Sequence, residues 1–147
     1  MIIRELSQQA CLEILAAARV GRLACASDGQ PYVVPITIAL AQHSLYSFSL
    51  PGQKIDWMRQ NPKVCLQVDQ AGRGDGWKSV VVTGTYEELP DRIGSKLERE
   101  HAWSLLSKHA NWWEPGGLKP VTADIPAEHL FYRINMDTVT GRESVPE

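Results

Sequence analysis

Six stretches of the chain carry the residue pattern of β-strands. Apolar and polar residues alternate in several of them, and β-branched or aromatic residues are frequent, as on a half-buried pleated surface. The dipeptide Asp28-Gly29 separates the first two stretches and is typical of a tight hairpin turn. The sequence therefore predicts strands over residues 22–26, 32–40, 45–49, 64–68, 77–86 and 130–136.

Three further stretches have helical spacing. Residues 7–18 follow a possible N-cap, Ser7, and residues 53–60 are stopped by Asn61-Pro62. Over residues 91–108, Leu97, His101 and Leu105 recur every four residues, with Ala102 and Leu106 beside them. Because the strands do not alternate with helices, the pattern favours a mainly β fold, an antiparallel barrel or sandwich-like sheet with peripheral helices, in one domain spanning residues 1–147.

The composition argues against several classes of protein. With 15 Lys and Arg against 17 Asp and Glu, the chain lacks a basic surplus, so we expect no nucleic-acid partner. No secretory signal is visible, and prolines and polar residues interrupt the uncharged stretch 29–53, so we expect a cytoplasmic protein without membrane association. Cys11, Cys25 and Cys65 are far apart among apolar neighbours, as reduced core thiols are. No histidine has the spacing of a metal ligand, so no metal site is expected.

The aromatic residues are unusual, with five tryptophans against two phenylalanines, because a buried indole needs a partner for its N–H. Trp57 and Trp103 lie on predicted helix faces and are expected in the core. The pair Trp112-Trp113 stands in a predicted loop, which favours an interface or a ligand lid. Strand alternation places Trp77 and Ser79 on one face, where an indole and a hydroxyl suit the edge of a planar heteroaromatic ring. The alternative is a strand partly covered on both faces.

The turn before residues 53–60 is the candidate anion site. The sequence has neither the dinucleotide-binding fingerprint nor the phosphate-binding loop, so a nucleotide would have to be held in another way. Here a predicted strand ends, the chain turns at Pro51-Gly52, and a helix begins next to Lys54. Free N–H groups at a helix start attract anions, and Ser49 and Lys54 could add a hydroxyl and a charge. The alternative is a capped helix with a solvated lysine.

The ordered combination of these motifs resembles a known family, the pyridoxamine 5′-phosphate oxidase-related flavin-binding split-barrel proteins. The resemblance is carried by Gly21-Arg22-Leu23-Ala24, the segment 28–36, the segment 46–54, Asn61-Pro62 and the segment 77–84. It covers nearly the whole chain, and the most similar branch is the nitroimidazole-resistance-type, flavin-nucleotide-binding one. The resemblance implies a six-stranded antiparallel split β-barrel that forms a homodimer, with flavin mononucleotide (FMN) in a cleft at the subunit interface.

The resemblance also assigns cofactor-binding residues. Val34, Pro35, Ile36 and Thr37 would run along the isoalloxazine ring, Ser47, Phe48 and Ser49 would line the ring and the ribityl chain, and Gln53 and Lys54 would meet the phosphate. Trp77 and Ser79 would contact the flavin across the dimer interface, and Trp113 would act as a lid or stacking residue. No catalytic residue is assigned.

These residues lead to one principal hypothesis and two alternatives. The first is an FMN-dependent oxidoreductase that takes electrons from a nicotinamide donor and reduces a small planar acceptor. The alternatives are a non-catalytic flavin-binding, storage or sensing module, and a split-barrel protein that uses haem or a deazaflavin. Oxidation of pyridoxamine phosphate is not expected, because the arginine-rich C-terminal segment of that enzyme is not apparent in residues 132–137.

Overall fold

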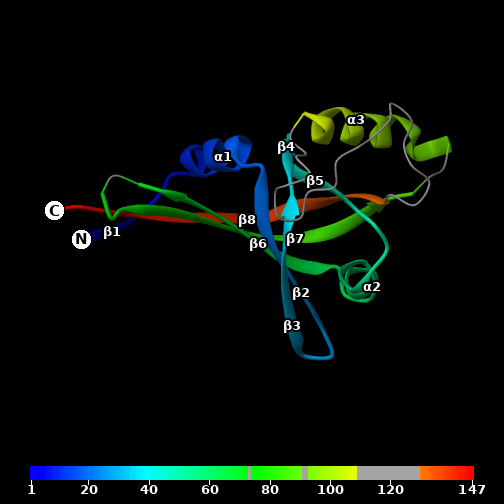
Figure 1. The fold of residues 1–147 in the computed structure, drawn as a ribbon, viewed down its shortest axis with the longest axis horizontal. Coiled ribbons are helices and arrows are strands. Elements are labelled where there is room, and N and C mark those ends of the chain that lie inside the picture. The colour runs from blue at the N-terminus through cyan, green and yellow to red at the C-terminus, as the bar shows by residue number, and fades with distance from the viewer. Residues whose placement is uncertain (73, 91–92, 109–129) are drawn as a thin grey trace.

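The computed structural model describes residues 1–72, 74–90, 93–108 and 130–147, which hold eight strands and three α-helices (Figure 1). The helices are α1 (Gln8–Ala17), α2 (Gln53–Gln60) and α3 (Lys96–Ser107), the last preceded by a 3-10 turn, η1 (Ile93–Ser95). The strands are β1 (Ile2–Glu5), β2 (Val20–Ser27), β3 (Gln30–Thr37), β4 (Ala39–Ala41), β5 (Ser44–Ser49), β6 (Lys63–Ala71), β7 (Trp77–Leu89) and β8 (Leu130–Val145).

All eight strands belong to one antiparallel sheet in the order β3-β2-β6-β7-β8-β5-β4, with β1 paired to β8. The mainly β class is confirmed, and each of the six predicted stretches forms strand structure. The number six is wrong, because β1 was not predicted and the predicted strand 32–40 is divided into β3, which pairs with β2, and β4, which pairs with β5. In the described part of the chain β3 and β4 end the order, so the split barrel is an open sheet rather than a closed one.

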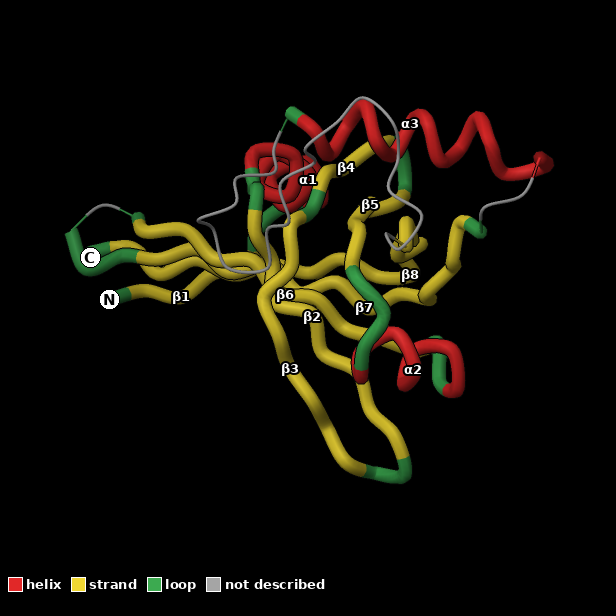
Figure 2. Tube along the Cα trace, turned by 45° about the vertical axis from the view of Figure 1, so that its right-hand side comes forward, coloured by secondary structure: helices red, strands yellow, loops and turns green. Residues whose placement is uncertain are grey.

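The three long strands β6, β7 and β8 form the middle of the sheet. In Figures 1 and 2, β6, β7 and β8 run from the end that holds both termini toward α2, and the β2–β3 hairpin projects away from the body. That hairpin turns at Asp28 and Gly29, which have φ angles of 50° and 79°, as the sequence pattern predicts for a tight turn. Helices α1 and α3 lie on one side of the sheet and α2 on the other.

Apolar side chains of the inner sheet face form the main core. Residues on alternate positions of β2, β6 and β7 pack there with Ile14 and Leu15 from α1 and Ile55 and Met58 from α2. A smaller cluster under α3 includes Phe48, Leu89 and Phe131. Both expected core tryptophans pack at the edges of these clusters: Trp57 lies 5.5 Å from the ring of Tyr32, and Trp103 lies 6.1 Å from Phe131.

Helix α3 buries a face that differs from the predicted stripe. Leu97 is 80% exposed and His101 is also exposed, whereas Ala102 and Leu106 are buried as expected. The third buried residue is Arg99, whose guanidinium donates to the Leu89 carbonyl at 3.2 Å and lies 5.2 Å from the centre of the Phe131 ring. A buried arginine is invisible to a hydrophobicity pattern, because only its tertiary partners make its burial favourable.

Candidate functional site

Helix α2 begins without a side-chain cap. At the start of α1 the Ser7 hydroxyl accepts a hydrogen bond from the Ala10 N–H at 3.1 Å, but at α2 the N-cap is Gly52, which has no side chain to accept one. A methyl group placed on Gly52 would meet nothing within 4 Å. No described side chain therefore caps the first N–H groups of α2, and uncapped N–H groups at a helix start can bind phosphate.

Lys54 stands in the first turn of this helix. Its side chain is half-buried, and no acidic partner of its ammonium occurs among the described residues. Burial lowers the pKa of Lys54, and the Cys25 thiol on β2 lies close enough to interact with it electrostatically. An anion next to this ammonium would compensate its desolvation. Gln53, by contrast, is exposed to solvent.

The position of α2 is fixed by packing and by an ion pair. Ile55 and Met58 are fully buried in the main core. Near the end of the helix, Arg59 pairs with Glu88 of β7 through two contacts of 2.9 and 3.2 Å. The Tyr86 hydroxyl donates to the same carboxylate at 2.7 Å. Because β7 is a central strand, these contacts hold α2 against the middle of the sheet.

The predicted ring-binding segments of β3 and β5 come together in the structure. The Ser47 hydroxyl donates to the Thr37 carbonyl at 2.6 Å. Both residues are buried, as are Ile36 and Ser49, whereas Val34 is half-buried and Pro35 is exposed. Phe48 points to the opposite face of β5 by strand alternation and packs on Phe131 under α3, with ring centres 6.1 Å apart. The contacts of all these residues with a cofactor remain predictions.

Among the described residues, two buried hydroxyl groups near Ser47 have no partner in normal hydrogen-bond geometry. They are Thr37 Oγ1 and the hydroxyl of Tyr132, which is the residue opposite Ser47 in the β5–β8 pairing. Burial raises the pKa of Tyr132, so this phenol stays protonated at neutral pH. Sequence reasoning missed Tyr132, because it stands in an ordinary alternating strand and only the pairing with β5 brings it to Ser47.

We expect the variant Tyr132→Phe to be at least as stable as the parent chain. It removes a buried hydroxyl that meets no partner in normal hydrogen-bond geometry in the described chain, so the free energy of unfolding should stay the same or rise by up to about 1 kcal/mol. The matched control is Tyr86→Phe, which should lower this free energy because it breaks the bond to Glu88. Urea unfolding of the three chains measures both effects, and a loss of stability in Tyr132→Phe would contradict the expectation.

Trp77 and Ser79 lie on the outer face of β7, as the alternation predicts. They line a cavity of about 360 Å³ together with Val81 and three residues of β8, which are Thr140, Gly141 and Arg142. Trp77 is 39% exposed, and the Ser79 hydroxyl accepts a hydrogen bond from Gln67 at 3.0 Å. Arg142 was missed from the sequence, because its strand was expected to end at residue 136.

The two halves of the predicted site are far apart within one chain. Cys25 lies next to Lys54 and directly follows Ala24 on β2. Ala24 pairs with Cys65 of β6, and Cys65 pairs with Thr83 of β7. Thr83 stands six residues from Trp77, roughly 20 Å at the rise of an antiparallel strand. Cys25 also lies on the inner face of the sheet and Trp77 on the outer face. One chain therefore does not bring Lys54 and Trp77 to the same ligand.

Trp113 lies outside the described residues. Of the cysteines, Cys11 and Cys25 are buried as expected, but Cys65 is only half-buried, and all three are free thiols. Across the described ranges there is no cluster of three or more potential metal ligands. None of the described helices is long and apolar enough to cross a membrane.

The open antiparallel sheet with helices at its edges defines the class of split-barrel proteins, and sequence comparison gives the family. Residues 7–143 match the family model described as pyridoxamine 5′-phosphate oxidase. The chain belongs to the pyridoxamine 5′-phosphate oxidase family.

Individual relatives agree with this assignment. The chain is similar to an uncharacterized protein of Rhizobium meliloti (strain 1021), with 55% identity over 97% of this chain and 95% of the relative. It is 58% identical to a protein of Mesorhizobium loti whose crystal structure is described as that of an FAD-binding protein, with a TM-score of 0.85 over 99% of this chain and 100% of the other. At 20% identity, a candidate 5-nitroimidazole antibiotic resistance protein of Bacteroides thetaiotaomicron shares the fold, with a TM-score of 0.73 over 97% and 89% of the two chains.

Proposed function

We propose that this protein binds a flavin, with FMN as the cofactor, and acts as an oxidoreductase on a small planar acceptor. The observation that carries the proposal is the start of α2, where uncapped N–H groups, an open glycine and a half-buried ammonium without an acidic partner in the described chain lie together. This donor set fits a phosphate. The FAD-binding description of the relative with 58% identity supports a flavin, since FMN and FAD share the riboflavin 5′-phosphate unit.

The remaining predicted residues extend from this point. Residues 34–37 of β3 and the Ser47 and Ser49 positions of β5 would hold the ring and the ribityl chain, with Gln53 beside the phosphate. The hydroxyl of Thr37 has no partner in the part of the chain that the structure describes, so a ligand contact would satisfy it. The flavin would supply the redox chemistry, and the protein would bind and orient it.

We further propose that the protein is a homodimer with the flavin at the subunit interface. Along β7, Trp77 lies roughly 20 Å from Thr83, the residue in register with the strand segment next to Lys54. This separation supports a dimer, because a second copy could bring Trp77 and Ser79 to the ligand. The outer sheet face offers an apolar surface for that copy: Val33 is 63% exposed, Val81 is 36% exposed, and Pro31, Pro35 and Cys65 lie at neighbouring positions on the same face.

An absorption spectrum of the protein as purified tests the cofactor. We expect flavin absorbance, and chromatography of the heat-released cofactor will distinguish FMN from FAD. A haem or deazaflavin spectrum, or a colourless protein that takes up no added flavin, would contradict the proposal.

Stopped-flow mixing with a reduced nicotinamide then tests the activity. An oxidoreductase with this electron donor should lose its flavin absorbance under anaerobic conditions and regain it on addition of an acceptor. A non-catalytic flavin-binding module would keep its absorbance, and that result would remove the enzyme part of the proposal while leaving the binding part intact.

A further inference from the structure

Two aromatic side chains stand beside the proposed phosphate site. Trp57 lies three positions after Lys54 on α2, so the two side chains share a helix face. Tyr32 lies opposite Cys25 in the β2–β3 pairing, and the Cys25 thiol is close enough to Lys54 to interact with its ammonium. The centres of the Tyr32 and Trp57 rings are 5.5 Å apart, with the ring planes inclined at 59°. The hairpin and α2, which lie side by side in Figures 1 and 2, therefore bring an aromatic pair to this lysine.

The aromatic pair keeps part of its surface open to a ligand. Tyr32 and Trp57 pack against the main core, but each is only half-buried. A base that stacks on an aromatic side chain needs an open ring surface rather than an enclosed cavity. Tyr32 also lies on the inner face of the sheet with Cys25, whereas the second copy is proposed to cover the outer face. The proposed dimer interface therefore does not include the pair.

The charges near the pair are compatible with a phosphate at Lys54. Asp56 is the acidic residue in the first turn of α2, but it is exposed and points about 200° around the helix axis from Lys54. Further along the helix, Arg59 and Glu88 pair with each other at 2.9 Å and largely cancel. The Lys54 ammonium is thus the charge that faces the same side of α2 as Trp57.

A buried hydroxyl without a normal partner lies at the same place. The hydroxyl of Tyr132 is fully buried, and it is close enough to the Cys25 thiol to interact with it electrostatically. Cys25 therefore has Lys54 on one side and this hydroxyl on another. Buried polar groups in native proteins usually have a partner, so a spare hydroxyl beside the lysine supports a ligand there.

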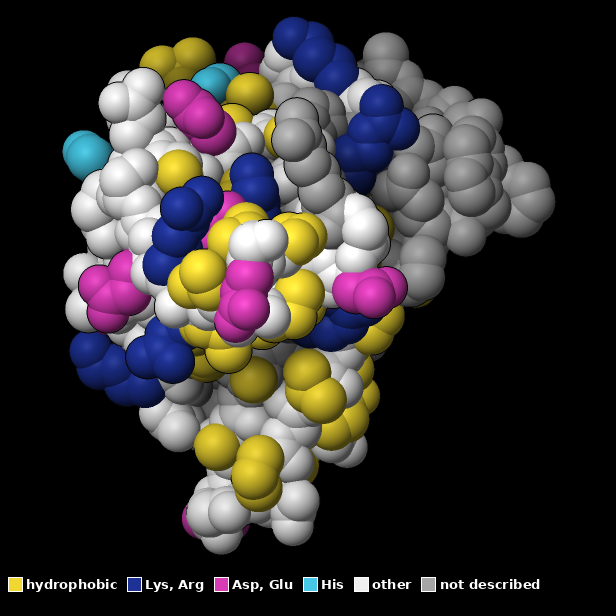
Figure 3. All heavy atoms as spheres, turned by 90° about the vertical axis from the view of Figure 1, so that its left-hand side faces the viewer, with side chains coloured by type: hydrophobic (Ala, Val, Ile, Leu, Met, Phe, Trp, Pro, Cys, Tyr) yellow, Lys and Arg dark blue, Asp and Glu magenta, His cyan; other side chains and the backbone are white. Residues whose placement is uncertain are grey.

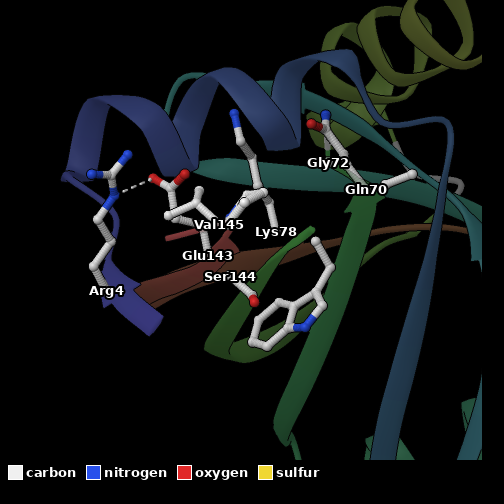
Figure 4. Close-up of a pocket in the computed structure, with 10 residues that line it drawn as sticks. Arg4, Gln70, Gly72, Lys78, Glu143, Ser144 and Val145 are labelled. Atoms are coloured by element: carbon white, nitrogen blue, oxygen red, sulfur yellow. Dashed lines mark ion pairs between the residues drawn. The ribbon is translucent and has the colours of Figure 1, made fainter. Parts of the chain in front are cut away.

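A larger cavity at the other end of the sheet suits a nucleotide less well. It has a volume of about 740 Å³ and lies at the end that holds the termini. Figure 4 shows Arg4 and Lys78 pointing to one side, but Glu143 stands opposite both of them in the strand pairing and forms an ion pair with Arg4 at 3.4 Å. Seen from this end, the surface carries apolar side chains bordered by charges of both signs (Figure 3). A carboxylate between the two cations disfavours a phosphate.

We propose that Tyr32 and Trp57 form a subsite for the adenine ring of FAD, so that the flavin site accepts FAD as well as FMN. FAD carries an adenosine monophosphate on the phosphate of its FMN unit, and that phosphate would lie at Lys54. The isoalloxazine ring would extend from there along residues 34–37, and the adenine would stack on the aromatic pair. This inference rests on the function proposed above, because it adds a second ring to the same phosphate site.

The test measures FMN and FAD affinities by isothermal titration calorimetry on the full chain freed of bound flavin. We expect Trp57→Leu to weaken FAD binding about fivefold or more, because it removes a stacking surface, and to leave the FMN affinity unchanged. Tyr32→Leu should act in the same direction. Trp103→Leu is the matched control, because it also removes a half-buried tryptophan at the edge of a core cluster, but on α3. It should leave both affinities unchanged, and melting temperatures verify that the variants are folded.

An unchanged FAD affinity in Trp57→Leu and Tyr32→Leu, or an equal loss for FMN and FAD, would overturn the proposal. An equal loss of FAD affinity in Trp103→Leu would overturn it as well. A parent chain that binds FMN but not FAD would remove the adenine subsite and leave the proposed function intact. A chain that binds neither flavin would contradict the proposed function, and the subsite with it.

Discussion

Replacement of Lys54 by methionine should weaken FMN binding by about 10- to 150-fold. The variant keeps a half-buried, unbranched apolar side chain but removes the ammonium, and a charge-assisted hydrogen bond to phosphate contributes about 1.5 to 3 kcal/mol. The unliganded chain should not lose stability, because burial already disfavours the charge and lowers the pKa of Lys54. Quenching of FMN fluorescence on titration measures the affinity.

Lys63→Met is the control for this substitution. Lys63 is an exposed lysine on the first residue of β6, with its ammonium 3.9 Å from Asp137, and its loss should leave the FMN affinity unchanged. An unchanged affinity in Lys54→Met would place the phosphate elsewhere.

Mixing Lys54→Met with Trp77→Ala chains tests the shared site as well, because each mixed dimer would regain one intact site. No recovery in dimers shown to have exchanged subunits would contradict a site built from two copies.

Gly84→Ala should be among the most destabilising small substitutions in this protein. Gly84 stands at the irregularity in the pairing of β7 with β8, where the register shifts between Thr83 and Gly84. A methyl group there would lie 2.6 Å from the Asn135 carbonyl oxygen and 2.7 Å from Ile134 Cγ2. Backbone atoms cannot rotate away as a side chain can, so β8 would have to move. We expect the free energy of unfolding to fall by about 1 to 3 kcal/mol or more.

The control for Gly84 is Gly94→Ala in η1. A methyl group on Gly94 would meet nothing within 4 Å, so this variant should be neutral or slightly more stable, since alanine restricts the unfolded chain. Urea midpoints of both variants and the parent chain make the comparison. Equal midpoints for Gly84→Ala and the parent would show that β7 and β8 separate more easily than their contact distances imply.

The two substitutions test different levels of the molecule. Gly84 lies in the central pairing of β7 with β8, and Lys54 lies at the start of α2, whose last turn is held on the sheet by the Arg59 pair with Glu88. If Gly84→Ala also weakens FMN binding, the loss of affinity should parallel the fall in the free energy of unfolding. Lys54→Met should lower the FMN affinity without lowering that free energy. Measuring the FMN affinity and the free energy of unfolding for both variants distinguishes residues that stabilise the sheet from residues that bind the cofactor.

The sequence predicted much of this fold because short-range patterns decide it. The alternation in residues 77–86 gave the correct faces, with Val80 and Val82 buried and Trp77 exposed. The Asp28-Gly29 turn was also correct, since positive φ angles favour those residue types. The sequence did not show β1, whose four residues are all exposed, or the second half of β8. β1 has no buried face to read, and the buried positions in the second half of β8 are Gly141 and Ser144, which are not large apolar residues. Pairing with a neighbouring strand makes each of them a strand.

For the candidate site too, the sequence predicted the local features and only the tertiary structure showed which residues come together. The sequence by itself determined the local chemistry: a strand end, a Pro51-Gly52 turn and Lys54 at a helix start, together with an indole and a hydroxyl on one strand face. Only the tertiary structure decided that Ser47 meets Thr37, that Tyr132 lies opposite Ser47, that Arg142 joins Trp77 and Ser79, and that Lys54 lies far from that cavity. The physical reason is that residue type and spacing fix conformation over a few residues, whereas the pairing order of a sheet brings together residues that are distant in sequence.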